Sequence, residues 1–255
     1  MAESRNLNHW HSYNDLAWTE RILCPPEESG EEPERIASLL ERRSDKRLNT
    51  VLHLGSGAGS YDYWLKKQYE ITGVDISNGM LREAQKLNPE IRYLKGDMRH
   101  IRLDRIYDAV IVPDAVDYMR TESDLAALFS VASSHLDSGG LFLVVANTSE
   151  EFRKNNFVYT GEAGDVHITV FENNHILPGE NAGYEAILCY LIRQRGELSI
   201  HSERHLLGLF NRESWISRLR SAGFSVSEDR LDDAYDHYLM TESTYLQTVF
   251  ICIKQ

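Results

Sequence analysis

The chain has 255 residues, enough for one α/β domain with an insertion, and 42% of them are hydrophobic, enough for a sizeable core. Its formal charge of −12 argues against DNA or RNA as substrate, because nucleic-acid enzymes present a basic face to the phosphates. Three scattered cysteines, no apolar N-terminal segment and no run of 18 apolar residues predict a cytoplasmic protein without disulfide framework, zinc site or membrane span.

The first 48 residues are expected to form a helical lead-in to the first strand. Apolar residues recur there at roughly helical spacing until Cys24-Pro-Pro interrupts them. A second helix is predicted over about Glu32 to Arg43, because its apolar residues make one stripe. The apolar residues of the first segment are Trp10, Tyr13, Leu16, Ala17 and Trp18.

From residue 50 to residue 146, short apolar runs alternate with helix-like segments. Such alternation implies a parallel sheet with helices on both faces, and the apolar run at 107–112 is typical of a strand buried on both sides. We predict strands over 50–54, 71–75, 91–94, 107–112 and 141–146, and helices over 60–68, 79–87 and 123–136, the last ended by Asp-Ser-Gly-Gly.

The pattern changes after residue 150. Residues 152–209 show strand-like alternation divided by turn-rich pieces, which predicts an antiparallel β insertion; a helix over about 212–222 and strands from 223 and over 244–253 follow. The predicted fold class is therefore α/β, a Rossmann-like seven-stranded mixed sheet with the last strand antiparallel, N-terminal helices and a β insertion after strand five. The expected units are a lead-in covering the site (1–48), a cofactor-binding domain (49–149 and 210–255) and an insertion forming an acceptor or dimer surface (150–209).

The segment VLHLGSGAGS, Val51 to Ser60, places three glycines straight after a short apolar run. Glycine lets the backbone turn sharply and lets a ligand approach where a Cβ would collide. The following helix offers free N–H groups, and Asp75 at the end of the next apolar run is placed to accept two ribose hydroxyls, unless it is an ordinary turn residue. The pattern predicts a nucleoside-type cofactor site. A nicotinamide or flavin enzyme is disfavoured, because the third glycine comes one residue too early for GxGxxG.

With these motifs the chain resembles the class I S-adenosylmethionine-dependent methyltransferases, over roughly residues 50–146 and 215–253. VLHLGSGAGS and VDIS match the family's glycine turn and acidic ribose motif, and GDMRHI resembles its adenine-side motif. YDAVIVPDAVDYM resembles the fourth strand and donor-end loop, and GGLFLV the fifth strand. The lead-in and the insertion resemble those of small-molecule N-methyltransferases, with sugar-amine and glycine-type enzymes nearest. The resemblance implies S-adenosyl-L-methionine as cofactor.

The resemblance also implies a set of cofactor contacts. Asp97 would lie near the adenine amine; capping a short following helix is its alternative role, and the two are compatible. The cofactor-binding residues that we expect are Gly55, Ser56, Gly57, Gly59, Asp75, Ile76, Asp97, Met98 and Pro113.

Three further residues are candidates for the reacting end of the site. Asp114 and Tyr118 follow the fourth strand, at the edge where open α/β sheets bind ligands, and Tyr13 stands in a segment that closes over the donor in the family. Core packing is the alternative for the N-terminal aromatics, and a helix start is the alternative for Asp117. His53 is expected to be a satisfied core histidine. The insertion histidines lack metal-ligand spacing and are expected to face solvent, with one of them as a conceivable base: His167, His175, His201 and His205.

Methyl transfer aligns a nucleophile with the donor, and an amine needs only to lose a proton, so a carboxylate or a tyrosine would suffice as base. We therefore predict an enzyme that methylates a small-molecule acceptor at an amine nitrogen, with no metal, no nucleic-acid or membrane partner, and a homodimer as one expected assembly. The alternatives are an O-methyltransferase, a protein or RNA methyltransferase, and a cofactor-binding sensor or partner protein without turnover. The small, polar loop at the donor end favours turnover.

Overall fold

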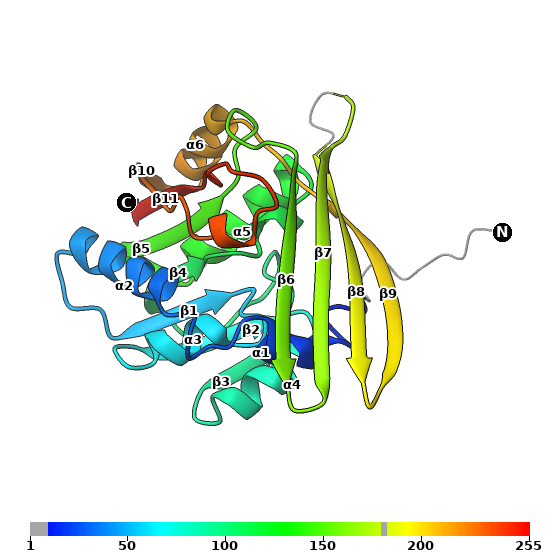
Figure 1. Cartoon of the computed structure of the whole chain (residues 1–255). Coiled ribbons are helices and arrows are strands. Elements are labelled where there is room, and N and C mark those ends of the chain that lie inside the picture. The colour runs from blue at the N-terminus through cyan, green and yellow to red at the C-terminus, as the bar shows by residue number, and fades with distance from the viewer. Residues whose placement is uncertain (1–9, 180–182) are drawn as a thin grey trace.

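The computed structural model describes residues 10–179 and 183–255 (Figure 1). The N-terminal segment contains η1 (Ala17–Thr19), α1 (Glu20–Leu23) and α2 (Glu31–Arg43). The α/β part contains β1 (Thr50–Leu54), α3 (Ser60–Leu65), β2 (Glu70–Asp75), α4 (Asn78–Leu87), β3 (Arg92–Lys95), β4 (Tyr107–Val112), η2 (Val116–Tyr118), α5 (Glu122–Ser134), β5 (Leu136–Ala146), α6 (Arg212–Ser221), β10 (Phe224–Arg230), η3 (Asp236–Tyr238) and β11 (Thr248–Lys254). Between β5 and α6 come β6 (Asn155–Ala163), β7 (Val166–Ile176), β8 (Tyr184–Gln194) and β9 (Glu197–Leu207).

The larger sheet has seven strands in the order β10-β11-β5-β4-β1-β2-β3. β1 pairs in parallel with β2 and β4, whereas β11 runs antiparallel to both β5 and β10. The predicted seven-stranded mixed sheet with an antiparallel last strand is confirmed. The chain order reverses between β1 and β4, so the carboxyl ends of these two strands border the crevice where open α/β sheets bind ligands.

Helices cover both faces of this sheet. On one face Leu52 belongs to a buried cluster with Phe129 of α5, and on the other Val51 belongs to a cluster with α2 and α3. His53 shares a face with Val51; it is 2% exposed, and its Nδ1 lies 2.7 Å from Oδ1 of Asp62. The prediction of a satisfied core histidine is confirmed. Among the described residues, no helix is long and apolar enough to cross a membrane.

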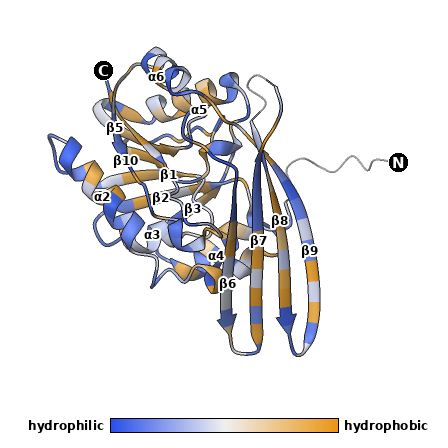
Figure 2. Cartoon of the chain, turned by 45° about the horizontal axis from the view of Figure 1, so that its top comes forward, coloured by the Kyte–Doolittle hydropathy of each residue, from blue (hydrophilic) through white to orange (hydrophobic). Residues whose placement is uncertain are grey.

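A second sheet, β6-β7-β8-β9, stands beside the α/β part and is antiparallel throughout (Figure 1). Hydrophobic and hydrophilic positions alternate along its long strands (Figure 2). Val170 and Tyr190 on its inner face are buried against Leu16 and Leu23 of the N-terminal segment. The predicted antiparallel insertion is therefore confirmed, and the N-terminal segment packs on its inner face.

The N-terminal lead-in is less helical than predicted. The first described residues form turns, and only η1 and the four-residue α1 precede α2. Polar groups compete for the backbone here: the Asn14 amide donates to the Trp10 carbonyl at 2.9 Å, and the backbone N–H groups of His11 and Ser12 donate to Glu203 of β9. The segment is held by contacts with distant parts of the chain rather than by helical hydrogen bonds.

Two helix ends and the start of β5 also differ from the prediction. α3 stops at Leu65 and α5 at Ser134, and β5 begins at Leu136. The Asp-Ser-Gly-Gly segment therefore lies within β5 rather than in a connecting turn. Its register with β4 shifts there and Gly139 has a φ of 79°, the signature of a bulge in the strand.

Candidate active site

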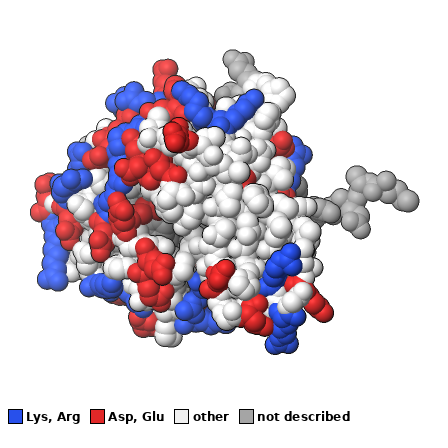
Figure 3. Space-filling view, viewed as in Figure 1, with Lys and Arg blue, Asp and Glu red and all other residues white. Residues whose placement is uncertain are grey.

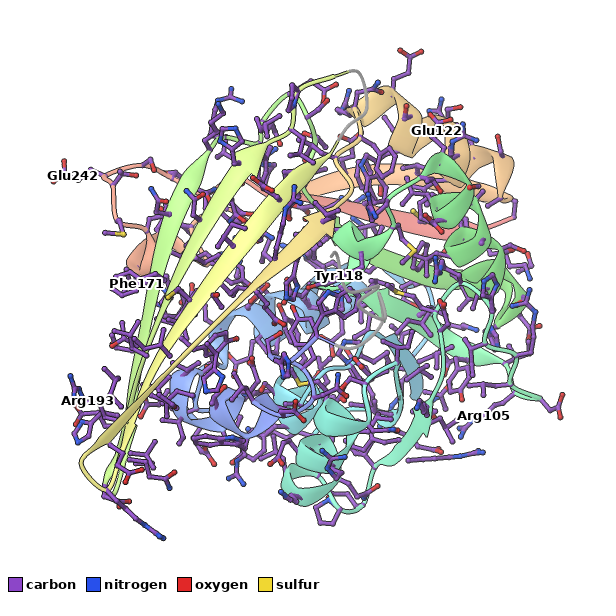
Figure 4. All side chains as sticks on the ribbon, turned by 90° about the vertical axis from the view of Figure 1, so that its right-hand side faces the viewer. Arg105, Tyr118, Glu122, Phe171, Arg193 and Glu242 are labelled. Carbon is purple, nitrogen blue, oxygen red and sulfur yellow. The ribbon has the colours of Figure 1, made fainter. Side chains whose placement is uncertain are left out.

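A cavity of about 2020 Å³ lies at the carboxyl ends of β1, β2 and β4. The N-terminal segment and the inner face of the four-stranded sheet form its other walls. Figure 4 places Tyr118 between that sheet and the α/β part. The cavity brings together the three residues expected at the reacting end and every expected cofactor residue except Gly59: Tyr13, Gly55, Ser56, Gly57, Asp75, Ile76, Asp97, Met98, Pro113, Asp114 and Tyr118.

The glycine turn forms one wall of the cavity. Gly55 and Gly57 have φ values of 75° and 53°, a region that glycine adopts without steric cost. A Cβ added to Gly55 would lie 2.3 Å from the Ala115 side chain, whereas one added to Gly57 would meet no atom within 4 Å. Gly57 therefore presents bare backbone to open space, which suits close approach of a ligand.

Asp75 is fixed against this turn. Its Oδ2 accepts from the Gly57 N–H at 2.9 Å and its Oδ1 from the Ser77 N–H at 2.7 Å, so each oxygen keeps a lone pair for a ligand hydroxyl. Burial raises the pKa of Asp75, and these two hydrogen bonds offset part of the rise. Nearby, Ser56 Oγ is buried and has no hydrogen-bond partner among the described residues. A bare backbone, two free carboxylate lone pairs and an unsatisfied hydroxyl fit the nucleoside part of S-adenosyl-L-methionine.

Asp97 lines the cavity together with Ile76 and Met98. Its carboxylate accepts from the Arg99 guanidinium at 2.6 Å and from the Arg99 backbone N–H at 2.9 Å. Burial would raise the pKa of Asp97, but the hydrogen bonds from Arg99 outweigh it and the pKa is lowered. Asp97 thus begins a turn and also lines the cavity, so the two roles expected for it, capping and ligand contact, are compatible.

Gly59 is the exception among the expected cofactor residues. It precedes α3 with a φ of 80°, and an added Cβ would lie 2.6 Å from the Tyr93 hydroxyl and 2.7 Å from the Asn88 amide. It is absent from the cavity lining. Glycine is required at position 59 by the backbone conformation at the start of α3 and by the close packing of Tyr93 and Asn88.

A chain of four side chains crosses the cavity wall. The Tyr13 and Tyr118 hydroxyls are 2.6 Å apart, the Tyr118 hydroxyl is 2.6 Å from His205 Nδ1, and His205 Nε2 is 2.9 Å from Glu203 Oε1. Trp10 stacks on the His205 ring, with centroids 5.4 Å apart. The segments that meet are the N-terminal turn, η2 and β9.

The charge of Glu203 fixes the direction of these hydrogen bonds. Burial would raise its pKa, but the hydrogen bonds from His205 and Ser12 outweigh that effect and lower it to about 2, so Glu203 is an anion. It accepts a hydrogen bond from Nε2–H, so in the neutral imidazole Nδ1 is the acceptor for the Tyr118 O–H. Tyr118 then accepts from Tyr13. Burial raises the pKa of both phenols well above the ordinary value, so both remain neutral.

Asp114 and Asp117 differ although they are three residues apart. Asp117 accepts from Asn147 Nδ2 and from the Tyr184 hydroxyl, each at 2.7 Å, and ties η2 to its surroundings. Asp114 lines the cavity, and its side chain is exposed to the space inside it. It has no hydrogen-bond partner among the described residues. Enclosure by the protein raises the pKa of Asp114. Asp114 is therefore free to bind a ligand, and Asp117 is structural.

Sequence reasoning missed Glu203 and assigned His205 to the solvent, which is wrong, because His205 is 1% exposed. The other insertion histidines, His167, His175 and His201, are exposed as expected. His205 shares its strand face with buried Leu207, but exposed His201 shares that face too, so alternation along the strand does not identify it.

Comparison with known proteins finds methyltransferases. The family of methyltransferase domains matches residues 51–140. A dTDP-3-amino-3,4,6-trideoxy-alpha-D-glucopyranose N,N-dimethyltransferase of Streptomyces venezuelae is 26% identical over 75% of this chain and 81% of its own. A dTDP-3-amino-3,6-dideoxy-alpha-D-glucopyranose N,N-dimethyltransferase of Streptomyces fradiae is 27% identical over 75% of each chain.

Solved structures share the fold over nearly the whole chain. Streptomyces venezuelae DesVI has a TM-score of 0.76 at 22% identity, covering 94% of this chain and 96% of its own. CalS10, an amino pentose methyltransferase from Micromonospora echinaspora solved with S-adenosylmethionine bound, has a TM-score of 0.74 at 18% identity, covering 97% and 98%. Together with the matched methyltransferase domain, these likenesses make the chain an S-adenosylmethionine-dependent methyltransferase, with S-adenosyl-L-methionine as its cofactor.

Proposed function

We propose that the enzyme methylates an amine nitrogen of a small molecule. The observation that carries this proposal is an unpartnered carboxylate, Asp114, in the same cavity as the phenols of Tyr13 and Tyr118. A carboxylate attracts an ammonium group, and phenolic oxygens accept its N–H groups. The relatives named as sugar N,N-dimethyltransferases support the same choice of atom.

When bound, the cofactor supplies an electrophilic methyl group on a sulfonium sulfur. The residues of this chain bind the cofactor, orient the acceptor and remove a proton from it. The glycine turn, Asp75 and Asp97 hold the nucleoside, with Ile76, Met98 and Pro113 lining its pocket. Asp114 draws in the protonated acceptor and orients it.

The hydrogen-bonded chain provides a route for the proton that the amine must lose. The ammonium group passes one proton to the Tyr118 oxygen as the original Tyr118 hydroxyl proton passes to His205 Nδ1. Glu203 then stabilises the imidazolium, and the amine lone pair is free to attack. Tyr118 is neutral before and after, which suits a phenol whose pKa burial has raised. Tyr13 donates to Tyr118 and positions it.

The parts of the chain divide between these tasks. We assign cofactor binding to residues 49–149 and 210–255, cover of the site to the lead-in, and acceptor binding to the inner face of the 150–209 insertion. Cys24, Cys189 and Cys252 are free thiols, in keeping with a cytoplasmic protein.

A homodimer is a further part of the proposal. The face of the molecule that carries β6–β9 is largely uncharged (Figure 3), and Figure 4 places Phe171 on the side of this sheet opposite Tyr118. Phe171 is 42% exposed and Ile200 63% exposed. Light scattering on the purified protein tests the dimer, and a monomeric mass at micromolar concentration would remove this part of the proposal.

The test of the main proposal begins with cofactor binding, by calorimetric titration with S-adenosyl-L-methionine and S-adenosylhomocysteine. Transfer of a labelled methyl group is then compared between amines and the matched alcohols. We expect methylated amine as product. Transfer to the alcohols alone would contradict the amine assignment, and cofactor binding with no transfer to any acceptor would favour a sensor.

A further inference from the structure

Four carboxyl side chains from different elements line the cavity: Glu20 of α1, Glu32 of α2, Asp114 after β4 and Glu172 of β7. Asp114 interacts electrostatically with each of the other three. In the described chain, Glu20, Asp114 and Glu172 form no ion pair with a lysine or arginine. These four residues, called here the acidic wall, bring four carboxyl groups into one space, and only Glu32 among them interacts with an arginine of the described chain, Arg35.

Tyrosine rings stand between these carboxyls. The Tyr159 hydroxyl donates to Glu172 at 3.0 Å, and Tyr61 and Tyr235 lie close to Glu32. Aromatic faces next to carboxylates suit organic cations, because the ring quadrupole and the anion attract the same ligand.

Glu32 and Tyr61 lie together at the acidic wall, and their hydrogen bonding is incomplete. Oε1 of Glu32 and the hydroxyl of Tyr61 are both shielded from solvent; the two groups interact with each other, and Tyr61 also with Tyr235, but without a hydrogen bond of good geometry among the described residues. Buried polar atoms are rarely left in this state unless a ligand or water satisfies them. An N–H donor in this part of the cavity would satisfy both atoms.

The arginines of the cavity do not balance the acidic wall. Of the described residues that line the cavity, eleven are Asp or Glu, four are Arg and none is Lys. Arg99 is paired with Asp97 and Asp124, and the other paired arginines are Arg35 with Asp233 and Arg204 with Glu185. Arg120, which is exposed, has no such pair in the described chain. A phosphate group inside this cavity would meet repulsion with little compensation.

We propose that the acceptor is a phosphate-free amine with a second cationic group, which the acidic wall binds at Glu32 and Glu20 while Asp114 holds the reacting ammonium. This deepens the function proposed above and rests on it. The relatives named for dTDP-linked sugars act on molecules that carry a diphosphate, so this chain is expected to differ from them in acceptor. The pKa of Glu20 and that of Glu32, each raised to about 7 by burial and then by repulsion from Asp114, fit carboxyls that await a cation.

The test measures binding to protein saturated with S-adenosylhomocysteine. Two pairs of probes are titrated calorimetrically: an aliphatic monoamine with a diamine of equal length, and an amino sugar with its nucleoside-diphosphate conjugate. The monoamine and the diamine are also titrated into the Glu32→Gln variant. We expect the diamine to bind at least 10-fold more tightly than the monoamine and the conjugate at least 10-fold more weakly than the free amino sugar. Glu32→Gln should remove most of the preference for the diamine.

Glu34→Gln is the matched control, because Glu34 lies on the same helix, is exposed and is absent from the cavity lining. It should keep the preference of the native chain, and neither variant should change the affinity for S-adenosylhomocysteine. The proposal is overturned if the diphosphate conjugate binds most tightly, if the diamine has no advantage, or if no amine binds. A change in cofactor affinity alone in Glu32→Gln would also overturn it, by assigning Glu32 to the cofactor. Methyl transfer is scored separately, so failure of the proposed reaction is distinguishable from failure of this preference.

Discussion

The phenolic oxygen of Tyr118 lies 2.6 Å from Nδ1 of His205, although 87 residues separate them in the chain. The contact joins the loop after β4, where we propose that the acceptor meets the donor, to a strand of the insertion. The insertion therefore does more than line the cavity, because its His205 accepts the hydrogen bond of the Tyr118 hydroxyl.

Replacing His205 with Gln should lower kcat at least about 10-fold, because general acid–base groups typically contribute 10²–10⁴-fold and Gln keeps only the hydrogen bond. The solvent isotope effect on kcat should also change, because the proton of Tyr118 no longer passes to an imidazole nitrogen. His175→Gln, an exposed histidine on the neighbouring part of the same sheet, is the control and should behave as the native enzyme. A His205 variant with lower kcat and an unaltered solvent isotope effect would mean that His205 only supports the fold.

The two tyrosines should not be equivalent. Tyr118→Phe breaks the link to His205 and leaves a buried imidazole nitrogen without its donor, so we expect about 100-fold lower kcat and a stability loss of about 1–3 kcal/mol. Tyr13→Phe removes only the terminal hydroxyl of the hydrogen-bonded series, so the losses of kcat and of stability should both be smaller. Single-turnover kinetics and urea unfolding measure the two effects. Equal losses in the two variants would contradict the order of the hydrogen bonds from Tyr13 through Tyr118 to His205.

The glycine turn and Asp75 were predictable because their signal is local: a strand, a sharp turn and a helix, then a carboxylate ending the next strand. The pair Glu203 and His205 was not predictable in the same way. His201 and His205 have the same parity on β9, yet His201 is exposed and His205 is buried. Residues 10–13 make the difference, because Trp10 stacks on His205 and the backbone of the next residues binds Glu203 from more than 190 positions away.

Asp75→Asn should weaken S-adenosylhomocysteine binding by about 10–150-fold, the equivalent of one charge-assisted hydrogen bond worth about 1.5–3 kcal/mol. Asn keeps the shape but supplies one acceptor oxygen instead of two. The exposed Asp104→Asn is a control of equal charge change and should bind as the native protein does. Calorimetry gives both affinities, and an unchanged value for Asp75→Asn would remove Asp75 from the cofactor site.

The acidic wall makes stability and acceptor binding depend on pH in opposite senses. Glu20 and Glu32 have pKa values raised from about 4.5 to about 7 by burial, so the folded protein holds more protons than the unfolded chain between these values. The stability that they contribute is full below pH 4.5 and is lost as the pH rises through 7. A bound cation favours the charged carboxylates, so diamine affinity should rise between pH 6 and pH 8.

Binding at pH 7 should therefore release protons. A bis-quaternary diammonium ion is the best probe, because it cannot lose protons of its own. Calorimetric enthalpies in two buffers of different ionisation enthalpy give the number released. That number should fall in the Glu20→Gln/Glu32→Gln double variant and stay the same in Glu34→Gln. An equal release from the double variant would assign the protons to other groups of the cavity, with Asp114 and Glu172 as the remaining carboxyls of the wall.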